Sequence, residues 1–144
     1  FGPPSAAGFG SAVFFETHLA AGGLEAVALA SYRRFVGAHW TEANEEAWMG
    51  RWKRILERAH GGAHDIVGEL RNLADVESRS SAERLLDGID DPSAAHAALV
   101  RAMDEPAVAE LAIYRTGDGE ALSGILVAAR RNNGEGISLV FLMD

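Results

Sequence analysis

The sequence predicts an α+β fold in which N-terminal helices pack on a C-terminal three- or four-stranded antiparallel β-meander. Two observations favour this class. Residues 107–144 read as three strands joined by tight turns at residues 117–119 (Gly-Asp-Gly) and 132–134 (Asn-Asn-Gly), and Asp-Gly and Asn-Gly are the strongest short-range signals of a β-hairpin. Residues 11–104 are instead mainly helical in their apolar spacing. Because helices come first and strands last, we expect a single α+β domain over residues 1–144.

The chain before the first clear helix is predicted to have little regular structure. Residues 1–10 contain two prolines and three glycines, which suits an irregular lead-in. Residues 11–21 include the apolar run Ala-Val-Phe-Phe, and a run this short fits the start of a helix as well as a short strand. Because Gly22 and Gly23 then interrupt the chain, the first long element is expected to begin after them.

Four to six helices are expected in the middle of the chain, and the first two are the longest. The first covers residues 24–39, where apolar residues recur at helical spacing on one side. The second covers residues 42–59 behind the N-cap Thr41. Its start is acidic and its later part is basic, as the helix dipole favours. Gly61 and Gly62 are expected to end it.

The later helices are predicted to be shorter. Apolar spacing indicates one over residues 63–75, and a capping box indicates another over residues 82–88. Asp91 is a favourable N-cap and Pro92 a favourable first helical residue, so a third helix should start there and run to about residue 103.

The last strand of the predicted meander should not lie bare at an edge. Residues 137–143 are apolar on both faces and carry no charge before Asp144. Edge strands are usually short, charged or interrupted, whereas a strand this apolar is normally buried on both faces. Its open side should therefore pair either with residues 13–15 of the same chain or with the same strand of a second copy. The first strand of the meander carries Glu110 and Arg115 and is expected to be the true edge.

Composition limits the function classes. The chain has no cysteine, which excludes disulfides, cysteine nucleophiles and thiolate metal sites and fits a reducing, cytoplasmic environment. No apolar run approaches the length of a membrane span, and no signal peptide is visible. The formal net charge is −8, with the acidic excess in the second half. We therefore expect neither a nucleic-acid partner nor a membrane partner.

The first candidate site lies around three tryptophans that are close together in the sequence. Trp48 and Trp52 share a face of the predicted second helix, and His39 and Trp40 precede it. Indole rings line ligand pockets and serve as hot spots in interfaces, but they also fill ordinary cores. Arg51 belongs to a neighbouring basic flank that could grip a carboxylate or a phosphate. The candidate ligand-binding residues are His39, Trp40, Trp48, Trp52 and Arg51, with core packing as the alternative.

The second candidate site is a metal site at two histidines. His60 and His64 are four residues apart, a spacing that puts two imidazoles on one face of a continuous helix. The double glycine between them argues against that helix and favours a polar loop. The sequence contains no phosphate-binding glycine loop and no nucleophile elbow, so we predict no cofactor and assign no catalytic residue.

These observations favour a non-catalytic protein-interaction or accessory module that self-associates, so the expected partner is a second copy or another protein. The alternative is a small-ligand-binding protein or an enzyme, with a pocket between the sheet and the Trp48/Trp52 helix. Two structural features bear on the choice: what lies beside the last strand, and whether the tryptophan region is hollow.

Overall fold

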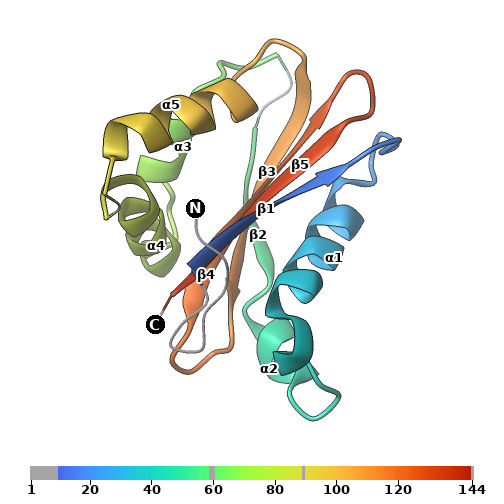
Figure 1. Ribbon diagram of the computed structural model, residues 1–144, viewed down its shortest axis with the longest axis vertical. Helices are drawn as coiled ribbons and strands as arrows, with labels where there is room; N and C mark the ends of the chain where they lie inside the picture. The colour runs from blue at the N-terminus through green and yellow to red at the C-terminus, as the bar shows by residue number, and fades with distance from the viewer. Residues whose placement is uncertain (1–9, 59–60, 89, 144) are drawn as a thin grey trace.

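The computed structural model describes residues 10–58, 61–88 and 90–143. Five strands and five helices lie along this part of the chain, with one short 3₁₀ turn (Figure 1). The strands are β1 (Gly10–Glu16), β2 (Lys53–Glu57), β3 (Val108–Gly117), β4 (Ser123–Arg131) and β5 (Gly136–Met143). The helices are α1 (Leu24–Val36), α2 (Glu45–Gly50), α3 (Ile66–Arg71), α4 (Val76–Asp87) and α5 (Pro92–Met103), and the 3₁₀ turn covers Gly37–His39. None of these helices combines the length and apolarity that crossing a bilayer requires.

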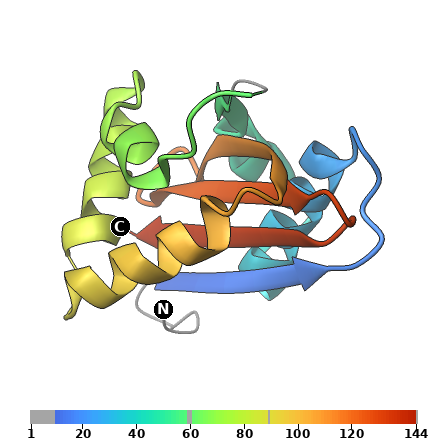
Figure 2. The ribbon, with the colours of Figure 1, turned by 90° about the horizontal axis from the view of Figure 1, so that it is seen from above.

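The five strands form one antiparallel sheet in the order β1-β5-β4-β3-β2, with helices on both faces. Helices α1 and α2 cover one face, and α3, α4 and α5 cover the other (Figures 1 and 2). The α+β class is confirmed. The predicted strand count is wrong, because the sheet has five strands, and the helices are not all N-terminal, because β1 and β2 lie before and among them. Most of the predicted lead-in, residues 1–10, lies outside the described residues; its last residue, Gly10, begins β1.

Strand β1 is the neighbour that the apolar last strand requires. It runs antiparallel to β5, and Val13 lies opposite Leu139 while Phe15 lies opposite Ile137. Of the two partners considered, the structure contains the segment of the same chain. Because β4 occupies the other side of β5, this strand has no free edge left for a second copy.

The predicted helix over residues 42–59 is wrong. Helix α2 ends at Gly50, and the chain then enters β2, which pairs with β3 and contains a bulge between Arg54 and Leu56. Tertiary context overrides the helical pattern because a strand here supplies hydrogen-bond partners to the outer edge of β3. The expectation that β3 forms an edge is wrong for the same reason.

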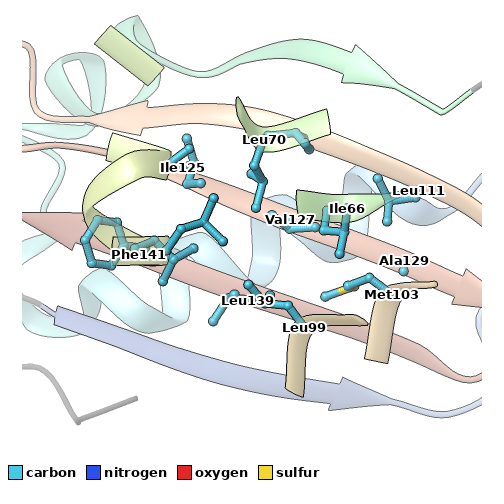
Figure 3. Packing of buried hydrophobic residues seen from close by; sticks show 14 of the residues in the cluster. Ile66, Leu70, Leu99, Met103, Leu111, Ile125, Val127, Ala129, Leu139 and Phe141 are labelled. Carbon is cyan, nitrogen blue, oxygen red and sulfur yellow. The ribbon is translucent and has the colours of Figure 1, made fainter. Parts of the chain in front are cut away.

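The continuous apolarity of β4 and β5 is explained by burial on both faces, as predicted. Alternate side chains face opposite sides of a strand, so each strand supplies two cores. Ile125, Val127, Leu139 and Phe141 pack under α3, α4 and α5 (Figure 3). The side chains between them in sequence pack under α1 and α2, namely Leu126, Ala128, Val140 and Leu142.

Helix boundaries follow the caps. Helix α1 and the 3₁₀ turn fill the predicted residues 24–39, and Asp91 accepts a hydrogen bond from the Ala94 amide at the start of α5, as expected. The predicted helices over residues 63–75 and 82–88 are misplaced: the structure has α3, a break, and α4. Asp75 caps α4 by accepting hydrogen bonds from the backbone N–H and the hydroxyl of Ser78, at 3.0 and 2.6 Å. Helix α4 therefore starts well before the predicted capping box.

The tight turn predicted at residues 117–119 is wrong: Gly117 belongs to β3, and residues 118–122 form a longer loop. The β4–β5 hairpin forms where predicted, but without the type I′ turn that Asn-Gly favours. The Gly134 amide donates to the Arg131 carbonyl at 3.0 Å, and the Arg131 amide donates to the Glu135 carbonyl at 2.8 Å. Only Gly134 in this turn has a positive φ, of 90°. This is the pattern of a type I turn followed by a glycine bulge, and the left-handed position explains the need for glycine.

Candidate interaction surface

The tryptophan region is filled by its own rings. Trp52 stacks on Tyr114 with ring centroids 4.6 Å apart, and Tyr32 stacks on the other side at 5.4 Å. Trp48 stacks on Trp40 at 6.3 Å. Tyr32, Trp48 and Tyr114 are buried. The five rings form a continuous aromatic cluster between α1, α2 and the sheet, which favours the core-packing interpretation of these residues.

Polar atoms of the aromatic cluster are paired within the protein. The single proton of the Tyr32 hydroxyl has two backbone carbonyl acceptors, Trp48 at 3.0 Å and Gly117 at 3.1 Å. The Gly117 amide donates to the same hydroxyl at 3.1 Å. The Trp48 indole donates to the His39 carbonyl at 3.2 Å, and the Trp40 indole to Glu45 at 3.3 Å. The rings of Tyr32, Trp40 and Trp48 are thereby held in place by the chain itself.

The candidate set is only partly brought together. Trp40, Trp48 and Trp52 share the aromatic cluster, and the backbone of His39 borders it. Arg51 instead pairs with Glu77 of α4, at 2.6 Å. Trp52 lies between α2 and β2 rather than on a helix. Tyr114 was not among the candidate residues. Its place in a predicted edge strand does not indicate that it contacts Trp52, which lies far away in the sequence.

Alkaline pH should reveal the burial of the two tyrosines. Burial raises the pKa of Tyr32 to about 12 and that of Tyr114 to about 12, against about 10 in an unfolded chain. The folded state therefore keeps phenolic protons that the unfolded state loses. Their contribution to the free energy of unfolding is fully present below about pH 10 and is lost as the pH rises through about 12. At pH 11 an ultraviolet titration should find about a tenth of the phenols ionised in the folded protein and about nine tenths in denaturant. Equal ionisation in both would contradict the burial of these hydroxyls.

The structure describes one of the two histidines of the predicted metal site. His60 lies outside the described residues. The His64 ring nitrogen Nδ1 lies 3.1 Å from the Glu105 carbonyl and 3.3 Å from the Asp104 carbonyl, so it donates a proton and cannot ligate a metal through that atom. In the described part of the chain, no three histidine or carboxylate side chains are grouped closely enough to hold a metal ion.

One buried group of charges serves the fold. Arg58, which follows β2, donates to Glu69 of α3 at 2.6 Å and to Asp104 at 2.9 Å. It also donates to the Met103 carbonyl at 2.7 Å. Burial by itself would lower the pKa of the Arg58 guanidinium, but the hydrogen bonds and negative charges of Glu69 and Asp104 outweigh it and raise the pKa above its usual value. These contacts join the residue after β2 to α3 and to the end of α5.

The two edges of the sheet differ in chemistry. Strand β2 has five residues, a bulge, and the charged side chains Lys53, Arg54 and Glu57. These are the features that keep edge strands from pairing with other chains. Strand β1 has seven residues and no charge before Glu16. Its side chains include Val13, 37% exposed, and Phe15, 77% exposed. Among the residues that the structure describes, the β1 edge therefore has no neighbouring strand and is apolar, whereas the β2 edge is charged and irregular.

Two grooves lie beside β1 on the face covered by α5. One has a volume of about 810 Å³ and the other about 500 Å³, and both include Ala98 of α5 in their walls. The larger groove lies beside Ser11, and its apolar wall consists of Leu85, Ala94, Ala95, Ala98, Phe141 and Met143. The smaller groove lies beside Phe15. The small alanine side chains of α5 leave room between this helix and the edge strand.

The sequence indicated part of the β1 edge and its grooves. It singled out residues 13–15 as a neighbour for the last strand, and the two exposed residues belong to that segment. It did not identify them as an edge, because the position of β1 at the rim depends on sheet order. No protein-family model matches the chain, and neither the curated proteins nor the solved structures contain a significant match.

Proposed function

We propose that this chain is a non-catalytic protein-interaction module that self-associates through the open edge of β1 and works in the cytoplasm. The observation that carries the proposal is the asymmetry of the sheet: β2 has the features that prevent edge pairing, and β1 has none of them before Glu16. An edge strand with exposed backbone groups and exposed apolar side chains is a template for another strand.

The side chains of β1 supply the driving force. Burying a fully exposed phenylalanine or valine contributes about 1.5–3 kcal/mol. Phe15 is 77% exposed, and a symmetric pair would cover two copies of it. Backbone hydrogen bonds along the strand would add to this. A second copy is the partner that β1 fits best. Glu16, the only charged residue of the strand, lies at its end, so the two Glu16 side chains of an antiparallel pair do not face one another.

The alternative function, a ligand or substrate pocket beside the tryptophans, has less support. The aromatic cluster packs between α2 and the sheet, and the Tyr32 hydroxyl and the Trp48 indole are bonded to the chain. A pocket of about 440 Å³ lies beside Tyr114, between the start of α1 and strands β2 and β3. Ligand pockets are lined mainly by apolar and aromatic side chains, whereas the charged residues Glu25, Arg54 and Glu57 line this one. The geometry of the β1 edge therefore supports the interaction module better.

Replacing Val13 with glutamate should raise the dissociation constant of self-association at least about 100-fold, since it places two like charges in an apolar edge that the pair would bury. Sedimentation velocity over a concentration series up to tens of micromolar would measure this. Val76→Glu is the matched control: it makes the same change at a side chain 66% exposed on α4, and it should leave association unchanged. A wild-type chain that stays monomeric throughout the series would overturn the proposed function.

A further inference from the structure

The sequence and exposure of β1 also indicate how two copies pair. We infer that they form a two-fold antiparallel β1–β1 pair centred on Val13, in which Phe15 of each copy enters the groove beside Ser11 of the other. This inference rests on the proposed function and names its geometry. The register of the strand supports this geometry. A two-fold axis at Val13 pairs all seven residues from Gly10 to Glu16, and it places Glu16 opposite Gly10.

Other registers are less favourable. Moving the axis toward the C-terminal end of β1 shortens the pair and brings the two Glu16 carboxylates toward one another. Moving it toward the N-terminal end leaves Phe15, the most exposed side chain of the strand, outside the pair. Only an axis at or beside Val13 covers Phe15 and separates the charges.

The faces of the strand support the same geometry. Residues directly opposite each other in a sheet share a face. Ser11, Val13 and Phe15 lie opposite Phe141, Leu139 and Ile137 of β5, which pack under the layer of α3, α4 and α5. The exposed side chains of β1 therefore point to the face on which the two grooves lie.

With the axis at Val13, the Phe15 side chain of one copy lies opposite Ser11 of the other. Ser11 borders the groove of about 810 Å³, whose apolar wall includes Leu85, Ala95 and Phe141. Directly opposite side chains approach within about 5.5 Å between Cβ atoms, and an aromatic ring reaches further along the strand. The rim of the groove also includes Arg84, Asp90 and Asp91, and its apolar wall offers a contact surface to the side chain that the monomer leaves exposed. The two sheets of five strands become continuous.

Cysteine cross-linking tests the register cleanly because the chain contains no cysteine. Disulfides need Cα atoms about 4.4–6.8 Å apart, and opposite residues of antiparallel strands are about 4.5 or 5.5 Å apart. Val13→Cys should therefore form an intermolecular disulfide under mild oxidation. Ser11→Cys alone and Phe15→Cys alone should not, whereas a mixture of the two should give a cross-linked heterodimer on a non-reducing gel.

Two further measurements test whether Phe15 enters the groove and whether the Val13 variants are folded. Phe15→Ala should raise the dissociation constant at least about tenfold, while Phe15→Leu should retain most of the affinity, as expected for a side chain buried in an apolar site. A mixture of Val13→Glu and Val13→Lys should restore the dimer that each variant loses, because opposite charges then face one another. Such rescue shows that both variants are folded.

The possible failures are distinguishable. A wild-type chain that is monomeric in sedimentation overturns the proposed function together with this inference. A dimer that is cross-linked by Phe15→Cys alone but not by Val13→Cys overturns the register and leaves the proposed function standing. A dimer that Val13→Cys cross-links but Phe15→Ala does not weaken overturns the groove.

Discussion

Replacing Arg58 with alanine should lower the free energy of unfolding by about 3–5 kcal/mol, the typical cost of leaving buried charges without their partner. The Arg58 side chain is 5% exposed, and its partners Glu69 and Asp104 are 16% and 11% exposed. In the variant these two carboxylates remain in a site with little water, and the Met103 carbonyl loses its donor. Urea denaturation monitored by circular dichroism would measure the loss.

Arg54→Ala is the control for this prediction. Arg54 is also an arginine at β2, but its side chain is 51% exposed and lies 3.7 Å from the exposed Glu57. Exposed pairs of this kind contribute about 0–1 kcal/mol, so this variant should unfold near the wild-type midpoint. Arg58→Lys should fall between the two, because an ammonium group cannot reproduce the fork of hydrogen bonds to Glu69 and Asp104. Equal stability of the Arg58 and Arg54 alanine variants would contradict the buried network.

Replacing Gly124 with alanine should cost about 3 kcal/mol or more, at the upper end of what overpacking causes. Gly124 lies in β4, in the middle of the sheet, opposite Thr116 on one side and Leu142 on the other. A Cβ atom at this position would collide with the Phe141 carbonyl oxygen and lie 2.9 Å from its carbon. Both are backbone atoms of β5, so relief requires the two strands to move apart and weakens their hydrogen bonds. Calorimetry should show a clear drop in the melting temperature.

Gly50→Ala is the matched control for Gly124→Ala. Gly50 is the last residue of α2, and a Cβ there meets no atom within 4 Å. Alanine is favoured over glycine in a helix by about 1 kcal/mol, so this variant should be as stable as the wild type or more stable. If Gly124→Ala were tolerated equally well, β4 and β5 could not be as closely apposed as the structure has them.

The two predictions concern features that sequence reasoning treats differently. A glycine inside an apolar strand pattern indicates close packing or a bulge, so Gly124 could be expected to allow an approach, though the approaching atom could not be named. Arg58 lies in the basic later part of the helix predicted over residues 42–59. Its burial follows from β2, which replaces the end of that helix and directs the side chain between α3 and α5.

Local patterns were sufficient for the features that depend on neighbouring residues. The β3–β4–β5 meander, the long helix α1 and the cap of α5 each arise from contacts within a few positions, so turn residues, apolar spacing and Asp91 predicted them. The double-faced apolarity of β5 also predicted a neighbouring strand and burial on both faces. These conclusions needed no knowledge of where distant segments lie.

Sheet order, the partner of each edge and the contents of the tryptophan region are determined by packing between distant parts of the chain. Strand β2 exists because β3 offers hydrogen-bond partners far along the sequence, and its local pattern resembles a helix. Trp52 becomes a core residue because Tyr32 and Tyr114 meet it from opposite layers. The exposed edge of β1 arises in the same way: pairing with β5 satisfies one side of a seven-residue strand, and its other side has no neighbouring strand in the described part of the chain. Val13 and Phe15 stay exposed beside this edge.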